Sequence, residues 1–447
     1  MKESVYITGL DIGTTKIACV VGELTENNKI KVIGYGKAES YGVKRGMVFN
    51  IQQTVDSIKK AVDEASEMAG VEITNVNVGI AGHHIKSIQH RGSLTRKNAK
   101  TYITQDELDE LRSNVFKLGM QPGEEIIDAI PQEYIVDNEA GISNPKGMLG
   151  NTIEANFHVI IGMKSAVENI VSCVENAGLV LDKLILEPIA SAVAVLGEDE
   201  KEAGVVLVDI GGGTTDIAIF SDSIIYHTAV IPFGGNVITD DIRIGCSVLR
   251  KYAEEMKVRY GSALPNENNE HHVISIPGIH GREPKEITFK NLSEIIHARL
   301  SEIFDMVKNE IDKCPNECAL TGGLVLTGGG ALMKHIQQLA AFKTSLDVRI
   351  GYPNEHIDND NPDELKSPVF ATCIGLILES FNRQKLSILN DDIEEEESVI
   401  VNKKESKSNR HKRGIGYLKD IITGFADIIF KNESIDENND NDTNQNI

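Results

Sequence analysis

Two segments of the chain share one pattern of residues that suits phosphate binding. Residues 9–18 read Gly-Leu-Asp-Ile-Gly-Thr-Thr-Lys-Ile-Ala, and residues 207–218 read Leu-Val-Asp-Ile-Gly-Gly-Gly-Thr-Thr-Asp-Ile-Ala. Glycine has no Cβ to block a phosphate, and its backbone can turn several N–H groups toward one point. Threonine hydroxyls add further donors. Two phosphate-binding turns are therefore predicted, and their candidate residues are Gly13, Thr14, Thr15, Lys16, Gly211, Gly212, Gly213, Thr214 and Thr215.

An aspartate precedes each turn, Asp11 in the first and Asp209 in the second. A carboxylate repels phosphate, but Mg²⁺ is held near substrate phosphates by one or two carboxylates while it keeps several waters. We therefore expect Asp11 and Asp209 to hold Mg²⁺ through water, with Lys16 supplying a positive charge to the phosphates. Two such turns facing each other would clamp one nucleotide between two lobes. Two ordinary β-hairpins are the alternative, because Gly and Thr are common in turns.

A third glycine-rich turn, formed by Gly328, Gly329 and Gly330, follows the apolar run 323–326 and precedes an expected helix at 333–342. Its lack of side chains would let a flat adenine or ribose approach the backbone closely. Taken alone, the same pattern also fits a tight turn or the end of a helix. The sequence has no G-x-x-x-x-G-K-[ST] segment, so a P-loop nucleoside triphosphatase is excluded.

The segments that must position these turns alternate between strand-like and helix-like patterns. Short apolar runs predict strands at 5–10, 17–21, 205–208, 217–220 and 324–326. Amphipathic stretches predict helices at 55–68 and 292–311. This alternation indicates an α/β protein, and 447 residues at roughly 150 per domain suggest about three domains.

Charge and cysteine content exclude several classes of function. The chain has 45 Lys and Arg against 67 Asp and Glu, and its net charge of −22 repels nucleic-acid phosphates, so no nucleic-acid partner is expected. Cys314 and Cys318 are the only close pair among six cysteines, and no second Cys/His pair completes a zinc site. A cytosolic protein with reduced thiols is predicted. The chain opens with no secretory signal and has no apolar run of the roughly 18 residues that a membrane span needs, so any membrane contact should be peripheral.

The last part of the chain has a different composition. Residues 391–397 carry six acids, residues 403–413 carry six Lys or Arg and one Glu, and residues 432–447 are rich in Asn and Asp. Between them, residues 414–431 predict an amphipathic helix whose apolar face consists of Ile415, Leu418, Ile421, Ile422, Phe425, Ile428 and Ile429. Basic residues beside such a face favour binding to anionic lipid. Docking on the protein's own body or in a partner's groove are the alternatives.

These turns and several longer segments resemble the actin/Hsp70/sugar-kinase ATPase superfamily and, within it, the FtsA family of bacterial cell-division proteins. The further segments are Ile-Pro-Gln-Glu-Tyr-Ile-Val-Asp at 130–137, Asn-Pro-Lys-Gly-Met-Leu-Gly at 144–150, Glu-Pro-Ile-Ala-Ser-Ala at 187–192, Ile-Pro-Phe-Gly-Gly-Asn-Val-Ile-Thr-Asp-Asp-Ile at 231–242 and Ala-Glu-Glu-Met-Lys at 253–257. The resemblance covers roughly residues 4–385 and resumes at the expected C-terminal helix.

The resemblance implies an actin-like duplicated α/β fold, with two lobes around a nucleotide cleft and an inserted subdomain, 1C. The implied boundaries are subdomain 1A at 1–82, 166–196 and 366–390, subdomain 1C at 83–165, subdomain 2A at 197–230 and 324–365, subdomain 2B at 231–323, a flexible linker at 391–413, a membrane-targeting helix at 414–431 and a disordered acidic tail at 432–447. The tail is a departure from the family pattern.

The family also implies ATP and Mg²⁺ as ligands and, at most, slow ATP hydrolysis. By similarity, Glu187 matches an acid that helps to position the attacking water. An acid at the start of a helix, where it favours the helix dipole, is its alternative role. Gly234, Gly235, Glu254 and Lys257 match positions near the phosphate, ribose and base of the nucleotide.

The implied function is that of a protein that polymerises like actin and tethers FtsZ filaments to the cytoplasmic face of the membrane at the division septum, where it recruits later division proteins. Subdomain 2B would receive the C-terminal peptide of FtsZ, with Arg299 as a candidate contact. A solvated charge on a helix surface is the alternative role of Arg299. A scaffold for pilus assembly and a small-molecule kinase are the alternative functions. A chaperone of the Hsp70 type is not expected, because the residues given after Asn390 are too few to form a peptide-binding domain.

Overall fold

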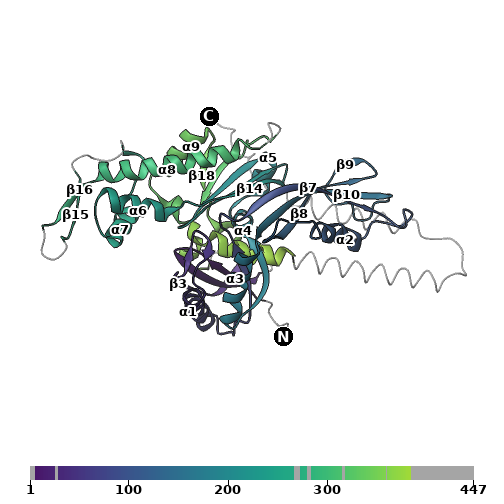
Figure 1. The fold of residues 1–447 in the computed structure, drawn as a ribbon, viewed down its shortest axis with the longest axis horizontal. Helices are drawn as coiled ribbons and strands as arrows, with labels where there is room; N and C mark the ends of the chain where they lie inside the picture. Colours follow the sequence, from purple (N-terminus) through teal and green to yellow (C-terminus); the bar gives the residue numbers. More distant parts are fainter. Residues whose placement is uncertain are drawn as a thin grey trace, which may run out of the picture. The chain divides into compact units, whose positions relative to one another are not determined.

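The computed structural model describes residues 6–25, 29–265, 272–278, 283–314, 318–358 and 360–383. All of them fall in the first of two units of the chain, Met1–Leu386. The expected linker, amphipathic helix and tail, residues 391–447, lie outside the described residues. The described part contains two five-stranded sheets and a four-stranded sheet (Figure 1).

The first sheet combines an antiparallel meander with two parallel strands. In the order β11-β6-β1-β2-β3, its strands are β11 (Val180–Leu186), β6 (Asn75–Ile80), β1 (Tyr6–Ile12), β2 (Lys16–Leu24) and β3 (Ile30–Glu39). β1 and β2 each contain six consecutive buried residues, as expected for strands that are covered on both faces.

The second sheet repeats this topology strand by strand. In the order β14-β13-β12-β17-β18, its strands are β14 (Ile224–Ile231), β13 (Thr215–Ser221), β12 (Val205–Ile210), β17 (Gly323–Thr327) and β18 (Val348–Ile350). The hairpin β12–β13 is thus the equivalent of β1–β2, and the two sequence repeats form the two equivalent turns. The duplicated fold is therefore confirmed.

Helix α1 (Ile51–Ala69) covers the first sheet, and its capping residues and apolar pattern explain why this segment is helical. Its N-cap Asn50 accepts a hydrogen bond from the backbone N–H of Gln53 at 3.1 Å, and Gly70 ends the helix in a left-handed conformation with φ of 68°. Its buried positions recur every three or four residues, and Val55, Ile58, Val62 and Ala65 face the sheet. Helix α3 (Lys164–Asn176) packs in the same core.

Two helices lie between the sheets and share a core with both. They are α4 (Glu187–Val195) and a helix at residues 371–383. Ala192 and Ile374 belong to one buried cluster with Ala18 of the first sheet and Leu207 of the second. This shared core joins the first lobe, built on the first sheet, to the second lobe, built on the second.

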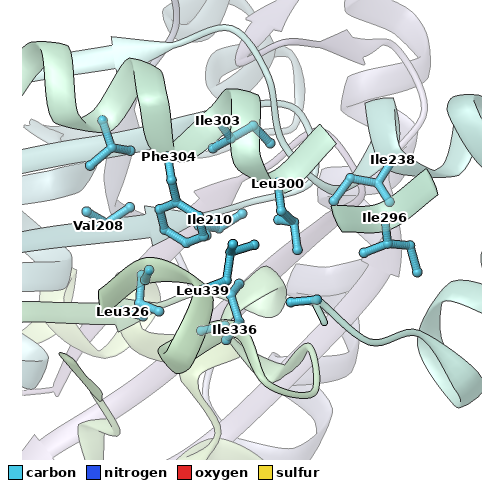
Figure 2. Close-up of a cluster of buried hydrophobic side chains, with 14 of the residues drawn as sticks. Val208, Ile210, Ile238, Ile296, Leu300, Ile303, Phe304, Leu326, Ile336 and Leu339 are labelled. Atoms are coloured by element: carbon cyan, nitrogen blue, oxygen red, sulfur yellow. The ribbon is translucent and has the colours of Figure 1, made fainter. Parts of the chain in front are cut away.

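The second lobe has its own core, shown in Figure 2. Helices α8 (Phe289–Ile311) and α9 (Ile336–Thr344) cover the second sheet, and α6 (Gly235–Gly245) and α7 (Arg250–Tyr260) pack beside α8. The residues that meet in this core include Val208, Ile210, Leu326, Ile238, Ile296, Leu300, Ile303, Phe304, Ile336 and Leu339.

The third sheet is inserted in the first lobe between β6 and α3, and we call it the insert. In the order β7-β10-β8-β9, its strands are β7 (Lys86–Thr95), β10 (Thr152–Met163), β8 (Glu124–Val136) and β9 (Glu139–Ile142), and α2 (Gln105–Val115) packs against them. The smaller elements are β4 (Val43–Lys44), β5 (Met47–Val48), α5 (Glu198–Ala203), β15 (Val273–Ile276), β16 (Lys285–Thr288), η3 (Gly329–Leu332), η4 (Pro353–His356), η5 (Asp363–Lys366) and η6 (Pro368–Phe370).

The strands and helices predicted from the apolar patterns are all present. The helix expected at 333–342 begins only at Ile336, whereas the helices expected at 55–68 and 292–311 begin a few residues earlier, at Ile51 and Phe289. Gly329 and Gly330 of the third glycine turn belong to the 3₁₀ turn η3, and His335 is left-handed with φ of 60°, so the chain changes direction before the helix. None of the helices in the described part is long and apolar enough to span a membrane.

Candidate nucleotide-binding site

A cavity of about 430 Å³ lies between the two lobes. All three predicted glycine turns line it. The lining residues from the sequence prediction are Asp11, Gly13, Thr14, Thr15, Lys16, Glu187, Asp209, Gly211, Gly212, Gly213, Thr214, Gly235, Glu254, Lys257, Gly328, Gly329 and Gly330. Thr215 and Gly234 are not part of the lining.

The first and second turns touch each other, and glycine is required at the contact. A Cβ added to Gly212 would overlap Thr15, and one added to Gly213 would overlap Thr14. The first turn is further fixed by the Gly46 N–H, which donates to Thr14 Oγ1 at 3.1 Å. The two turns therefore form opposite walls of one narrow space.

The second turn is supported from behind by the loop that enters α6. The N–H groups of Gly235 and Asn236 donate to the carbonyls of Gly211 at 2.9 Å and Gly212 at 2.8 Å. A Cβ at Gly234 would lie only 2.6 Å from the Gly211 carbonyl oxygen, so this position supports the turn without reaching the cavity.

Thr215 also faces away from the cavity. Its Oγ1 donates to the Phe233 carbonyl at 2.8 Å, whereas its neighbours Thr214 and Asp216 both line the space. Successive side chains of a strand point to opposite faces, and β13 begins at Thr215.

Five acidic side chains line the cavity: Asp11, Glu187, Asp209, Asp216 and Glu254. Burial raises the pKa of Asp209 to about 6, and the charge of Asp11 adds to this rise. Burial and the charges of Asp11, Asp216 and Asp209 raise the pKa of Glu187 well above its ordinary value. This concentration of acids leaves the cavity with an excess of negative charge that a cation would offset.

Hydrogen bonds hold two of these acids in place. Asp209 Oδ2 accepts from Ser191 Oγ at 2.7 Å and from Thr372 Oγ1 at 3.3 Å. Asp216 Oδ2 accepts from Thr214 Oγ1 at 3.0 Å, while its buried Oδ1 has no hydrogen-bond partner among the described residues. Burial, followed by the charge of Asp209, raises the pKa of Asp216 well above its ordinary value.

The donor set fits a hydrated magnesium ion. Carboxylate oxygens are the ligands that Mg²⁺ prefers, and it keeps most of its waters. In the described part of the chain, no three His, Cys, Asp or Glu side chains converge closely enough to form a complete metal site by themselves. Waters would therefore have to complete the coordination of an ion held by Asp11 and Asp209.

Lys16 is the cation of the first turn. Its Nζ lies 3.4 Å from Asp11 Oδ2 and 4.7 Å from the centre of the Phe370 ring. Burial alone would lower the pKa of Lys16, but the opposing charges, above all that of Asp11, raise it above its ordinary value. Lys16 therefore stays protonated and can bind phosphate.

Glu254 and Lys257 of α7 lie on another part of the same cavity. Lys257 Nζ is 2.8 Å from Glu254 Oε2 and donates to the Gly235 carbonyl at 3.0 Å and to Thr239 Oγ1 at 2.9 Å. Apolar residues share this lining, and they are Ile238, Val258, Leu300, Leu332 and Met333. An apolar wall beside a charged pair suits a flat base joined to a polar sugar.

Arg299 does not line this cavity. Its guanidinium binds Asp241 through Nε at 2.6 Å and through a second nitrogen at 3.1 Å, and it also pairs with Glu302. Its charged centre lies 5.8 Å from the Phe233 ring centre. The seven apolar residues of the expected membrane helix, Ile415 to Ile429, lie outside the described residues.

Three residues of the site were not predicted from the sequence: Asp216 and Thr372 line the cavity, and Ser191 donates to Asp209. Asp216 could have been predicted, because the second repeat ends in Asp where the first ends in Lys16. Ser191 could also have been predicted, since it lies one helical turn after Glu187 and so faces the same side of α4. Thr372 could not, because only the fold brings it beside Asp209.

The comparisons with known proteins agree with this fold. A family model described as "Cell division protein FtsA" matches residues 206–375, and one described as "SHS2 domain inserted in FTSA" matches residues 82–161. The cell division protein FtsA of Neisseria meningitidis is 40% identical over 374 residues, which cover 83% of this chain and 89% of that protein. The chain belongs to the FtsA family. The FtsA proteins of Pseudomonas aeruginosa and Escherichia coli are 38% and 33% identical, over 85% and 88% of this chain and 90% and 94% of theirs.

Solved structures place this FtsA family member among actin-like proteins by fold. The PilM-PilN type IV pilus biogenesis complex matches with a TM-score of 0.60 at 16% identity, over 84% of this chain and 98% of that chain. MreB 5 of Spiroplasma citri bound to AMPPNP matches with a TM-score of 0.51 at 16% identity, over 87% and 99%. The insert of β7 to β10 falls in the region of the FtsA-specific SHS2 match.

Proposed function

We propose that this FtsA family member is an ATP-binding scaffold that polymerises like actin and tethers FtsZ filaments to the cytoplasmic face of the membrane at the division site, where it recruits later division proteins. Family membership favours cell division over pilus assembly or a small-molecule kinase. The observation that carries the nucleotide part is the cavity in which two glycine turns of opposite lobes meet beside buried acids.

In this proposal the phosphates of ATP lie between the first and second turns. Backbone N–H groups of the glycines and Lys16 would bind them, and Glu254 and Lys257 would meet the sugar and base. Asp11 and Asp209 would hold Mg²⁺ through water, and the ion would neutralise phosphate charge. The bound AMPPNP of the similarly folded MreB 5 supports an adenine nucleotide as the ligand.

We expect ATP to act mainly as a conformational ligand. Glu187 begins α4, directly before Pro188, and lines the cavity where it could orient a water molecule. Burial and the charges of Asp11, Asp216 and Asp209 raise its pKa, and we expect any hydrolysis to be slow. A nucleotide that touches both lobes shifts assembly by its different affinity for their open and closed arrangements.

The partner contacts are proposed for two other regions. Arg299 of α8 is our candidate for the FtsZ peptide, and its bidentate pair with Asp241 gives it a fixed orientation. The apolar face of residues 414–431 would lie on anionic lipid, with the basic residues of 403–413 beside it.

Flotation with anionic liposomes tests the membrane tether. The full chain and a chain truncated after Lys412 would be compared with and without Mg·ATP. The proposal predicts that the full chain floats and the truncated chain does not, and that ATP increases flotation through assembly. Flotation of neither chain would refute the tether and leave only the nucleotide part of the proposal.

A further inference from the structure

The insert belongs to the first lobe in sequence but contacts the second lobe directly. It lies between β6 and α3 of the first lobe, yet β7 and β8 run beside β14, the edge strand of the second sheet (Figure 1). β7 is itself an edge strand of the insert. β7 and β14 belong to separate sheets and are not paired as strands. Side chains make the contacts between these two edges.

The insert donates hydrogen bonds to the backbone of β14. Gln89 Nε2 donates to the Tyr226 carbonyl at 3.0 Å, and Ser87 Oγ donates to the Thr228 carbonyl at 3.3 Å. From β8, Gln132 Nε2 donates to the carbonyl of residue 225. Carbonyl groups that an edge strand would otherwise present to water are thereby bound by the other lobe.

The most buried of these contacts is made by His158 of β10, which is 1% exposed. Its Nε2 lies 2.9 Å from Thr228 Oγ1, and its Nδ1 lies 3.4 Å from Gln89 Nε2. A histidine imidazole packed against a threonine hydroxyl inside an interface fixes the position of both strands.

The strand that the insert contacts leads directly to the cavity. β14 ends at Ile231, and the following loop reaches Gly235 and Asn236, whose N–H groups bind the carbonyls of the second turn. In the last strand pair, Ile231 lies opposite Thr215, the first residue of β13. A displacement of β14 must therefore also displace the second phosphate turn.

The equivalent edge of the first sheet is held in a similar way by residues that follow β18 of the second sheet. Asn361, 6% exposed, accepts a hydrogen bond from the Val32 N–H at 3.0 Å and donates to the Ile30 carbonyl at 3.0 Å. Ile357 forms a β-bridge with Ile30. Each sheet thus has its edge strand covered by a segment that departs from the other lobe.

We propose that Ser87, Gln89, Gln132 and His158 form a strap that holds the two lobes in the observed arrangement and couples the insert to the second phosphate turn. The donors are in one lobe and the acceptors in the other, so rotation of the lobes must stretch or break these bonds. The strap thus makes the insert sensitive to the opening of the cleft, whatever ligand the cleft binds.

Hydrogen–deuterium exchange of the nucleotide-free full chain tests the strap. Gln89→Ala combined with Gln132→Ala removes two strap bonds without deleting a core side chain. We expect exchange to become roughly three- to tenfold faster in residues 224–231 and, with them, in the second turn at 209–216, because two partly hydrated hydrogen bonds together contribute about 1 kcal/mol.

The matched control is Gln52→Ala combined with Gln105→Ala. Each of these glutamines donates to an aspartate one turn along its own helix at 3.0 Å, so the control removes two similar bonds within single elements. Its exchange at 209–216 and 224–231 should equal that of the wild type. Faster exchange confined to 224–231, no change, or an equal effect of the control would each overturn the strap. Because no nucleotide is present, failure of ATP binding would not affect this result.

Discussion

The first and second glycine turns are built on equivalent hairpins but end in residues of opposite charge. The first ends in Lys16, which pairs with Asp11 and lies over Phe370, whereas the second ends in Asp216, whose buried Oδ1 has no hydrogen-bond partner within the described part of the chain. The duplicated backbone supplies the same cradle on both sides. In the proposed site, the difference at this one position would give one side a cation for phosphate and the other a further carboxylate for a hydrated metal ion.

The largest effect is expected from separating the two turns. Gly213→Val would place a branched side chain where even a Cβ overlaps Thr14. We expect affinity for a fluorescent ATP analogue, measured by titration, to fall by roughly 100-fold or more, because core overpacking of this kind costs about 1–3 kcal/mol and the turns must also move apart.

Gly119→Ala is the control for this change, since a Cβ there meets no atom within 4 Å. It should bind the analogue like the wild type. If Gly213→Val bound within threefold of the wild type while remaining folded by circular dichroism, the two turns would not be the phosphate site.

A smaller effect is expected when the cation of the first turn is removed. Lys16→Met should weaken binding of the ATP analogue roughly 10- to 100-fold, because a charged hydrogen bond contributes about 1.5–3 kcal/mol. Asp216→Asn should instead reduce the gain in affinity that Mg²⁺ produces. Lys343→Met, which removes a cation paired with Asp305 on α9 and α8, serves as the control. Equal losses from Lys16→Met and Asp216→Asn would contradict the division of roles between the turns.

The sequence could predict the duplicated turns because their chemistry is local. A turn that admits only glycine, and an acid at its start, are visible in a few adjacent residues. The equivalent hairpins, the strands and the main helices follow from the same short patterns, and the structure confirms them. The site residues themselves remain predictions until a ligand is bound.

What the sequence could not supply depends on strand orientation and on distant segments. Thr215 has the right type and spacing, but alternation along β13 points it toward Phe233 while Thr214 and Asp216 face the cavity. Thr372 reaches Asp209 only because the helix at 371–383 lies between the sheets. No pattern in the sequence indicated that the insert would contact β14 of the opposite lobe.

We predict that the stability of the protein, measured without nucleotide or Mg²⁺, depends on pH because of an acid of the second turn. The pKa of Asp209 is raised to about 6 from 3.8, so the folded state holds this proton more tightly than the unfolded state. The stabilisation is complete below pH 3.8 and is lost as the pH rises through 6, with a total change of about 3 kcal/mol.

Thermal unfolding of Asp209→Asn and wild type across pH 4 to 7 measures this contribution. His158 acts in the opposite direction, because burial and then the charge of His227 lower its pKa to about 4, and its contribution to stability falls as the pH drops from 6.5 to 4. The difference between variant and wild type removes the His158 effect. We expect the variant to become increasingly more stable than the wild type toward pH 7. Parallel stability profiles would show that Asp209 does not cause the pH dependence.

The smallest effects distinguish the two covered edge strands. Asn361 is buried and makes two hydrogen bonds to the backbone of β3, so Asn361→Ala should lower the free energy of unfolding in urea by about 1–3 kcal/mol. Gln89 is exposed, and water can replace its bond to the Tyr226 carbonyl, so Gln89→Ala should cost about 0.5 kcal/mol or less. The first edge would then depend on one buried residue for stability, whereas the second is held by several weak bonds that can break one at a time. A contact made of several weak bonds would allow the insert to shift without unfolding either lobe. An equal loss of stability in Asn361→Ala and Gln89→Ala would contradict this difference between the two edges.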